Sequence, residues 1–265
     1  MLSLDPKELT VQRLHQLLLG AVGPRPIAFA STLDPEGRPN LAPFSFFNVF
    51  SANPPILVFS PARSGRTGQS KDTFNNAKAV PEVVINVVNY NMVHQMSLAS
   101  SPYAPGVDEF VKAGFTALAS QKVAPFRVAE APVQLECVVT QVIPLGENNG
   151  AGNLVLAEIK LIHIKEEILD NEGKIDQQKI DLVARLGGDW YCRVIPESLF
   201  KVAKPLTTLG IGVNALPISV RNSKVLTGND LGMLGNVESL PLAEEIDEMQ
   251  WNSNIKDILD ATIGD

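Results

Sequence analysis

The hydrophobic pattern of the chain changes its period after about residue 20. Near the N-terminus, Asp5-Pro6 predicts a helix start, because Asp caps helix N-termini and Pro fits the first turn. An apolar stripe at helical spacing then runs from Leu9 to Leu18, and Gly20 can end the helix. We therefore expect one N-terminal helix that begins at Asp5.

Beyond this point the apolar residues form short or alternating runs, which are typical of strands. The clearest signal is a hairpin, in which an Asn/Gly-rich loop joins Val133–Ile143 to Leu154–Lys165. Other β-rich segments are Ile27–Leu33, Arg38–Phe47, Ile56–Ser60 and Val83–Val88. Short helices are expected at Thr73–Ala79, Asn91–Ser100 and Asp108–Ala113. Strands dominate without regular strand–helix alternation, so the pattern predicts a mainly β protein: a closed or partly closed antiparallel barrel with a few helices.

Charge is distributed unevenly along the 265 residues. The net charge is −7, yet residues 229–265 contain nine acids and one base and alone carry −8. Apolar residues in this tail, together with a possible amphipathic helix over Leu242–Ile263, favour an ordered extension that docks on the body or on a partner. A disordered acidic tail is the alternative. We expect one domain over residues 1–203 and an acidic extension over residues 204–265.

Composition and motifs exclude several classes of function. An acidic chain without a basic excess is not typical of nucleic-acid binding. Two cysteines cannot form a disulfide framework, the three histidines lack metal-ligand spacing, and no apolar run is long enough to span a bilayer. Gly210–Ala215 matches a dinucleotide-binding pattern, with Asp230 downstream, but Pro205 and Pro217 remove the strand and helix that it requires. We expect a cytoplasmic protein with no metal site and no membrane segment.

A basic, hydroxyl-rich segment covers Ser60–Ala79. Its stretch from residue 61 to residue 80 carries +3, and its hydroxyls and two glycines precede an expected helix start. Cations, close backbone approach and a helix N-terminus all favour a bound phosphate, although the spacing is not that of a P-loop. A solvated basic loop explains the segment equally well on this evidence alone.

A second unusual stretch, Asn40–Phe50, holds four of the eleven phenylalanines. Aromatic clusters are usually core. However, Pro43 and the polar groups of Ser45 and Asn48 also fit a strand that leaves its ladder and turns polar groups toward a planar heterocycle.

Together these stretches resemble the flavin reductase-like, FMN-binding split-barrel family. The resemblance begins at Gly23–Thr32 and continues through Asn40–Asn48, Lys71-Asp72-Thr73 and Val84–Val88 to Gly187-Gly188 and Tyr191. It implies an antiparallel, Greek-key split β-barrel, a homodimer, and FMN at the dimer interface. The residues that it implies for FMN binding are Asn40, Ala42, Pro43, Ser45, Phe46, Phe47, Asn48, Ser60, Arg63, Arg66, Lys71, Asp72 and Thr73.

The resemblance also implies an NAD(P)H:FMN oxidoreductase, with a monooxygenase as a possible partner. Hydride transfer from nicotinamide to flavin is chemistry of the cofactors, so no catalytic side chain is expected. Two alternatives stay open: an FMN-binding electron-transfer protein that does not use NAD(P)H directly, and a protein that keeps the fold without flavin. The residues do not distinguish NADH from NADPH, or bound FMN from FMN as substrate.

Overall fold

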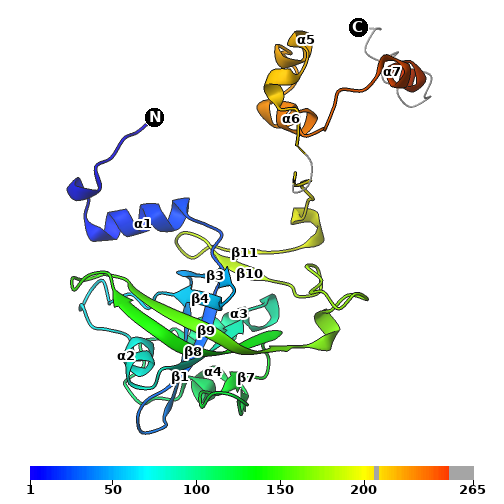
Figure 1. The fold of residues 1–265 in the computed structure, drawn as a ribbon. Coiled ribbons are helices and arrows are strands. Elements are labelled where there is room, and N and C mark those ends of the chain that lie inside the picture. Colours follow the sequence, from blue (N-terminus) through cyan, green and yellow to red (C-terminus); the bar gives the residue numbers. More distant parts are fainter. Residues whose placement is uncertain (206–208, 251–265) are drawn as a thin grey trace. The chain divides into compact units, whose positions relative to one another are not determined.

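A seven-stranded antiparallel sheet forms the centre of the first part of the chain, in the order β2-β1-β5-β8-β9-β4-β3 (Figure 1). The computed structural model describes residues 1–205 and 209–250. The strands of this sheet are β1 (Ala28–Leu33), β2 (Pro39–Phe44), β3 (Phe47–Ala52), β4 (Pro55–Phe59), β5 (Glu82–Val87), β8 (Val133–Pro144) and β9 (Asn153–Ile164). The predicted hairpin is confirmed as β8 and β9.

A two-residue link joins the two edge strands of this sheet. β2 ends one edge and β3 ends the other, yet only Ser45 and Phe46 separate them in the chain. Two residues cannot span a flat seven-stranded sheet, because strands lie about 4.8 Å apart. The sheet must therefore curl until its edges meet, and a break in pairing remains between β2 and β3. The predicted fold class, a mainly β split barrel, is confirmed.

Alternation along the strands separates two hydrophobic cores. On β1, Ala28 and Ala30 belong to the inner core with Leu57, Phe59 and Ile85. Phe29, between them, points to the opposite face and packs with Leu41, Met92, Met96 and Phe110 in the outer core. Because successive side chains of a strand point to opposite faces, β1 is buried on both sides.

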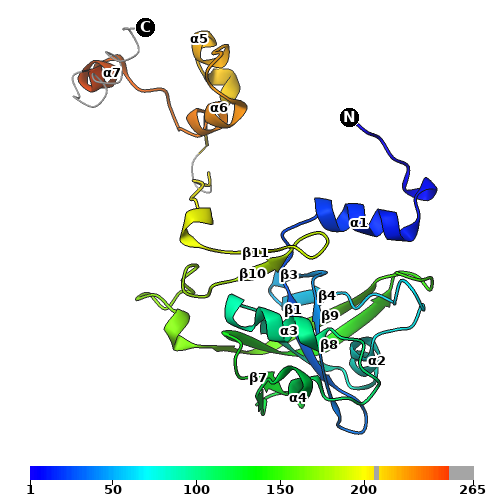
Figure 2. The ribbon, with the colours of Figure 1, turned by 180° about the vertical axis from the view of Figure 1, so that it is seen from behind.

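Three helices cover parts of this barrel. They are α2 (Asp72–Ala79), α3 (Val93–Ala99) and α4 (Glu109–Ala113). α3 and α4 pack against each other and against β2, and they cover the outer core (Figure 2). Ala77 of α2 enters the inner core instead. Two small hairpins complete this part, β6 (Ala117–Leu118) with β7 (Arg127–Val128), and β10 (Val183–Arg185) with β11 (Tyr191–Arg193).

The N-terminal helix differs from the prediction. Asp5 does cap a helix, but only the 3₁₀ turn η1 (Pro6–Glu8), and α1 (Val11–Ala21) begins separately with Thr10 as its cap. The single expected helix was wrong because Thr10 offers a second capping oxygen, which accepts a hydrogen bond from the Arg13 N–H. Further 3₁₀ turns are η2 (Tyr90–Met92), η3 (Glu166–Ile168) and η4 (Pro196–Ser198).

A buried carboxylate holds the loop after β6 against β8. Glu136 is fully buried and accepts hydrogen bonds from the Gln121 and Lys122 N–H groups, at 2.9 and 2.6 Å. His163 of β9 lies 2.7 Å from the same carboxylate, so this histidine is a packing residue, as expected. Burial alone would raise the pKa of Glu136, but the hydrogen bonds from Gln121, His163 and Lys122 leave it below its usual value.

We predict that Glu136→Gln lowers the free energy of unfolding by about 2 kcal/mol at pH 7, because the hydrogen bonds lose their charged acceptor. A depressed carboxylate pKa stabilises the fold above the unfolded value near pH 4.3, and this stabilisation is lost as the pH falls through the folded pKa. Urea unfolding at pH 7 and at pH 3 should therefore show a difference that shrinks in acid.

Glu158→Gln is the control for this prediction. Glu158 lies on the neighbouring strand β9 and pairs with Lys160, but its side chain is partly exposed. This variant should change stability by less than about 1 kcal/mol. Equal effects of the two variants would contradict the role of Glu136.

A second compact unit of the chain begins at Phe200. It contains η5 (Val213–Ala215), α5 (Ile218–Arg221), α6 (Gly228–Leu234) and α7 (Ala243–Gln250). Among the described residues of this unit, none before the glycines at 210 and 212 belongs to a strand, and Asp230 accepts hydrogen bonds from Thr227 at the start of α6. These contacts agree with the rejection of a dinucleotide site.

The described part of the acidic tail contains α6 and α7, which a non-helical stretch over residues 235–242 joins. α7 covers the first part of the amphipathic helix expected over Leu242–Ile263, and the rest lies outside the described residues. Packing of the extension on the barrel or on a partner remains a prediction. None of the helices in the described ranges is long and apolar enough to cross a membrane.

Candidate functional site

Two neighbouring segments of the chain, β2 and the β2–β3 link, line two different cavities. The first, which we call the basic cavity, measures about 310 Å³ and lies between β2, the loop of residues 64–71 with the start of α2, and residues 99–109. The second, the aromatic cavity, measures about 480 Å³ and is lined by residues 22–26, Ser45–Asn48, Phe50, Val58–Ser60 and Leu154. The predicted site residues are therefore divided between them.

The loop before α2 is folded by its own backbone. The Ser64 N–H donates to the Gln69 carbonyl, and the Gly68 N–H donates to the Ser64 carbonyl. Gly68 has a φ of 71°, which a residue with a side chain rarely adopts. Arg63 braces the turn by donating from Nη1 to the Gly68 carbonyl at 3.2 Å. The loop is thus a defined structure that presents Arg66 to the basic cavity.

This region has the features of an anion site. Lys71 is the N-cap residue of α2, and no side chain caps the helix there. Unsatisfied N–H groups and the helix dipole both favour an anion at such an end. Arg63 Nε is buried without a hydrogen-bond partner, which leaves one more cationic donor to satisfy. Arg66, Lys71 and Thr73 line the same cavity, so these residues fit a flavin phosphate.

The free edge of β2 forms the second wall of the basic cavity. In the register with β1, Leu41 and the two flanking prolines, Pro39 and Pro43, occupy positions whose backbone groups point away from β1. Proline has no N–H, so only Leu41 has a donor on this edge, and it donates to buried Glu109 at 2.9 Å. The expectation that the strand leaves its ladder at Pro43 was wrong: Pro43 still lies opposite Phe29, because an outward edge position needs no N–H.

Asn40 belongs to a hydrogen-bond network that joins β2 to α2. Its Oδ1 accepts from Thr73 Oγ1 at 2.7 Å, and its Nδ2 donates to Glu109 at 3.2 Å. Asn76 of α2 donates to Thr32 Oγ1, which lies opposite Asn40 on β1. Burial raises the pKa of Glu109, against the opposing effect of the Leu41 N–H. The network fixes the start of α2 relative to the strand.

One wall of the aromatic cavity contains a buried arginine, Arg25. Arg25 donates from Nη1 to the Leu19 and Val22 carbonyls and from Nη2 to the Leu186 carbonyl, and its Nε lies 3.4 Å from Ser45 Oγ. Burial, and secondarily Arg185, lowers the pKa of Arg25. Ser60 also lies here, and its Oγ accepts from the Asn153 N–H at 3.1 Å. Ser60 was expected beside the phosphate, but it lines the other cavity.

The structure thus brings part of the predicted set together. The basic cavity contains Asn40, Ala42, Pro43, Arg66, Lys71, Asp72 and Thr73, whereas the aromatic cavity contains Ser45, Phe46, Phe47, Asn48 and Ser60. The sequence reasoning did not single out Arg25, Glu109 or the loop Ser100–Tyr103. Only the fold shows that the Glu109 carboxylate meets the edge of β2.

Cysteine and histidine chemistry is not a feature of either cavity. Cys137 is buried as expected, and burial raises the pKa of its thiol to about 12. Among the residues that the structure describes, no group of three or more His, Cys, Asp or Glu side chains could hold a metal ion.

Comparison with known proteins identifies the family of this chain. Residues 21–179 match the flavin reductase-like domain family. A protein of Aquifex aeolicus (strain VF5) is 36% identical over 197 residues, which cover 74% of this chain and 97% of that protein. The chain belongs to the flavin reductase-like family, as the resemblance predicted, and this places it among the flavin-binding oxidoreductases.

Solved structures agree with this assignment. Nitrilotriacetate monooxygenase component B from Bacillus cereus superposes with a TM-score of 0.71 at 31% identity, covering 76% of this chain and 98% of that one. The 2-nitrobenzoate 2-nitroreductase NbaA from Pseudomonas fluorescens gives a TM-score of 0.68 at 28% identity, covering 79% of this chain and 100% of that one.

We predict that Arg66→Ala combined with Lys71→Ala weakens FMN binding by about 2 kcal/mol, or roughly 30-fold in Kd, because two charge-assisted contacts to the phosphate are lost. The difference should shrink as salt is raised, since both cations are exposed. The measurement is a fluorescence titration with FMN. A charge-matched variant, Lys78→Ala with Lys174→Ala, should bind FMN like the unmodified protein, and equal affinity of both double variants would contradict this placement.

Proposed function

We propose that this protein is an FMN-binding oxidoreductase of the flavin reductase type, which passes hydride from NAD(P)H to FMN. The observation that supports it most directly is the anion site at the start of α2, where an uncapped helix end, Arg66 and Lys71 line one cavity. Family membership supports a flavin, and this anion site favours one that carries a phosphate.

Each wall of the basic cavity has a separate task in this proposal. Arg63, Arg66, Lys71 and the α2 N-terminus hold the phosphate. The β2 edge at Ala42 and Pro43 contacts the ring system, and its outward carbonyls can accept hydrogen bonds from it. Glu109 and Asn40 position this edge and are not required to exchange protons with substrate. Bound flavin itself supplies the hydride acceptor, so the protein needs to bind, orient and expose it.

The test is an absorption spectrum of the purified protein, reconstituted with FMN, before and after anaerobic addition of NADH or NADPH. We expect bleaching of the visible absorption band of the oxidised flavin with at least one of the two nucleotides. Bleaching by dithionite but not by a nicotinamide would contradict the reductase activity and favour the electron-transfer alternative. A protein that cannot be reconstituted with flavin would contradict both.

We propose further that the protein is a homodimer and hands its reduced flavin to a second component, such as a monooxygenase. The similarity to a monooxygenase component B supports the second part. For the first, β3 is an edge strand on which Val49 and Phe50 are exposed, and Val11 and Leu18 are exposed on α1. Exposed large apolar side chains on an edge strand favour a partner surface.

Light scattering coupled to size exclusion should therefore give a mass of twice the 28.6 kDa chain at micromolar concentration. Phe50→Asp should shift the protein toward monomer, because it places a charge on an apolar contact surface. Val111→Asp, on α4, is a comparably exposed control and should leave the mass unchanged. A stable monomer of the unmodified protein would contradict the dimer.

A further inference from the structure

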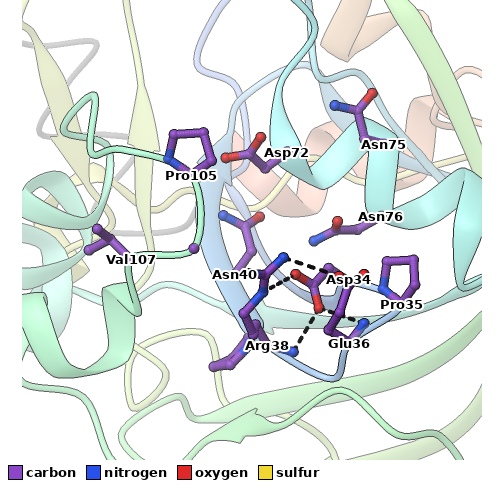
Figure 3. A pocket seen from close by; sticks show the side chains of 12 residues that line it. Asp34, Pro35, Glu36, Arg38, Asn40, Asp72, Asn75, Asn76, Pro105 and Val107 are labelled. Carbon is purple, nitrogen blue, oxygen red and sulfur yellow. Dashed lines mark hydrogen bonds and ion pairs between the residues drawn. The ribbon is translucent and has the colours of Figure 1, made fainter.

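A third cavity adjoins the basic cavity and has no role in the function proposed above. It measures about 250 Å³ and lies between the turn Asp34–Arg38, the face of α2 with Asp72, Asn75 and Asn76, and the loop Pro105–Val107 (Figure 3). Asn40, Asp72 and Pro105 line both this cavity and the basic cavity. A ligand whose phosphate is held at the start of α2 can therefore extend past Asp72 into this space.

The charges in the third cavity do not favour a phosphate. Arg38 is its one cation, and it already pairs with Asp34 at 2.5 Å and with Glu36 at 3.1 Å. Asp34 is also saturated by the Glu36 and Arg38 N–H groups, so this pair shapes the turn. Figure 3 shows both ion-pair partners lying beside Arg38 rather than across the cavity from it.

The groups left to meet a ligand are acceptors and amides. Within the described residues, Asp72 and Asn75 make no side-chain hydrogen bond, and both lie on α2 facing this space. A carboxylate suits a ribose diol, as in dinucleotide sites where Asp or Glu binds the 2′-hydroxyl. Asparagine amides match the N6/N7 edge of adenine. Pro35, Pro105 and Val107 provide flat apolar walls for a planar base.

We propose that the third cavity is an adenosine subsite, which takes the unphosphorylated adenosine of a dinucleotide whose phosphates lie at the start of α2. The proposal rests on the flavin site described above. FAD carries this chemistry, because its adenosine is joined to the flavin phosphate through a second phosphate. NADH does not, because its phosphates would need the site that the flavin phosphate occupies.

The experiment compares ligands that differ only in the adenosine portion. Val107 lines the third cavity and not the basic cavity, so Val107→Trp fills the subsite while leaving the phosphate site intact. Equilibrium dialysis with FMN and with FAD should show unchanged FMN affinity, which also reports a folded protein, and FAD affinity lowered about tenfold or more. Asn75→Trp, on the exposed face of α2, should reproduce this selectivity. Val111→Trp, at a 77% exposed position of α4 that lines neither cavity, is the control for a new surface tryptophan.

The second arm measures steady-state kinetics with saturating FMN. Val107→Trp should leave KM for NADH unchanged, because the subsite takes the adenosine of FAD and not that of NADH. Unchanged FAD affinity, or a KM for NADH raised tenfold or more, would overturn the subsite for FAD while FMN binding still stands. An unmodified protein that binds no flavin would instead overturn the proposed function itself.

Discussion

The two-residue link between β2 and β3 is the constraint on which the rest of the structure depends. These strands are the opposite edges of one sheet, so Ser45 and Phe46 force the sheet to close while leaving a seam where no strand pairs with the next. Closure buries the small inward residues of β1 in one core and turns Phe29 toward the helices. It also places the seam between the two cavities, which is why one continuous stretch of sequence contributes to both.

An unpaired strand edge is usually an aggregation hazard, and here it is used as a wall. Two of the three outward positions of β2 are prolines, which have no donor to leave unsatisfied, and the third donates to Glu109. The same carboxylate also meets Asn40, so α4 fixes the edge and the start of α2 through a few hydrogen bonds. Burying Glu109 raises its pKa, and the hydrogen bonds that it accepts offset part of that cost.

The basic cavity and the third cavity adjoin each other but differ in charge. The segment from residue 61 to residue 80 is +3 in a chain of net charge −7, and it delivers its cations to the end of a helix whose dipole has the same sign. In the adjoining cavity Arg38 is neutralised by its own turn, so this cavity offers carboxylate and amide groups. Adjacent spaces of opposite character suit a ligand with an anionic middle and a neutral polar end.

The sequence by itself determined the strand pattern, the β8–β9 hairpin, the antiparallel barrel and the basic segment before α2, because each depends on local periodicity, turn residues and local charge. Its resemblance to the flavin reductase-like family carried the assignment of the family. Only the tertiary structure decided that Ser60 and Lys71 face different cavities, that Arg25 reaches Ser45, and that Glu109 meets the edge of β2. The last two contacts join residues 20 and 68 positions apart, and which strand edge stays unpaired follows from closure of the whole sheet, which no local pattern encodes.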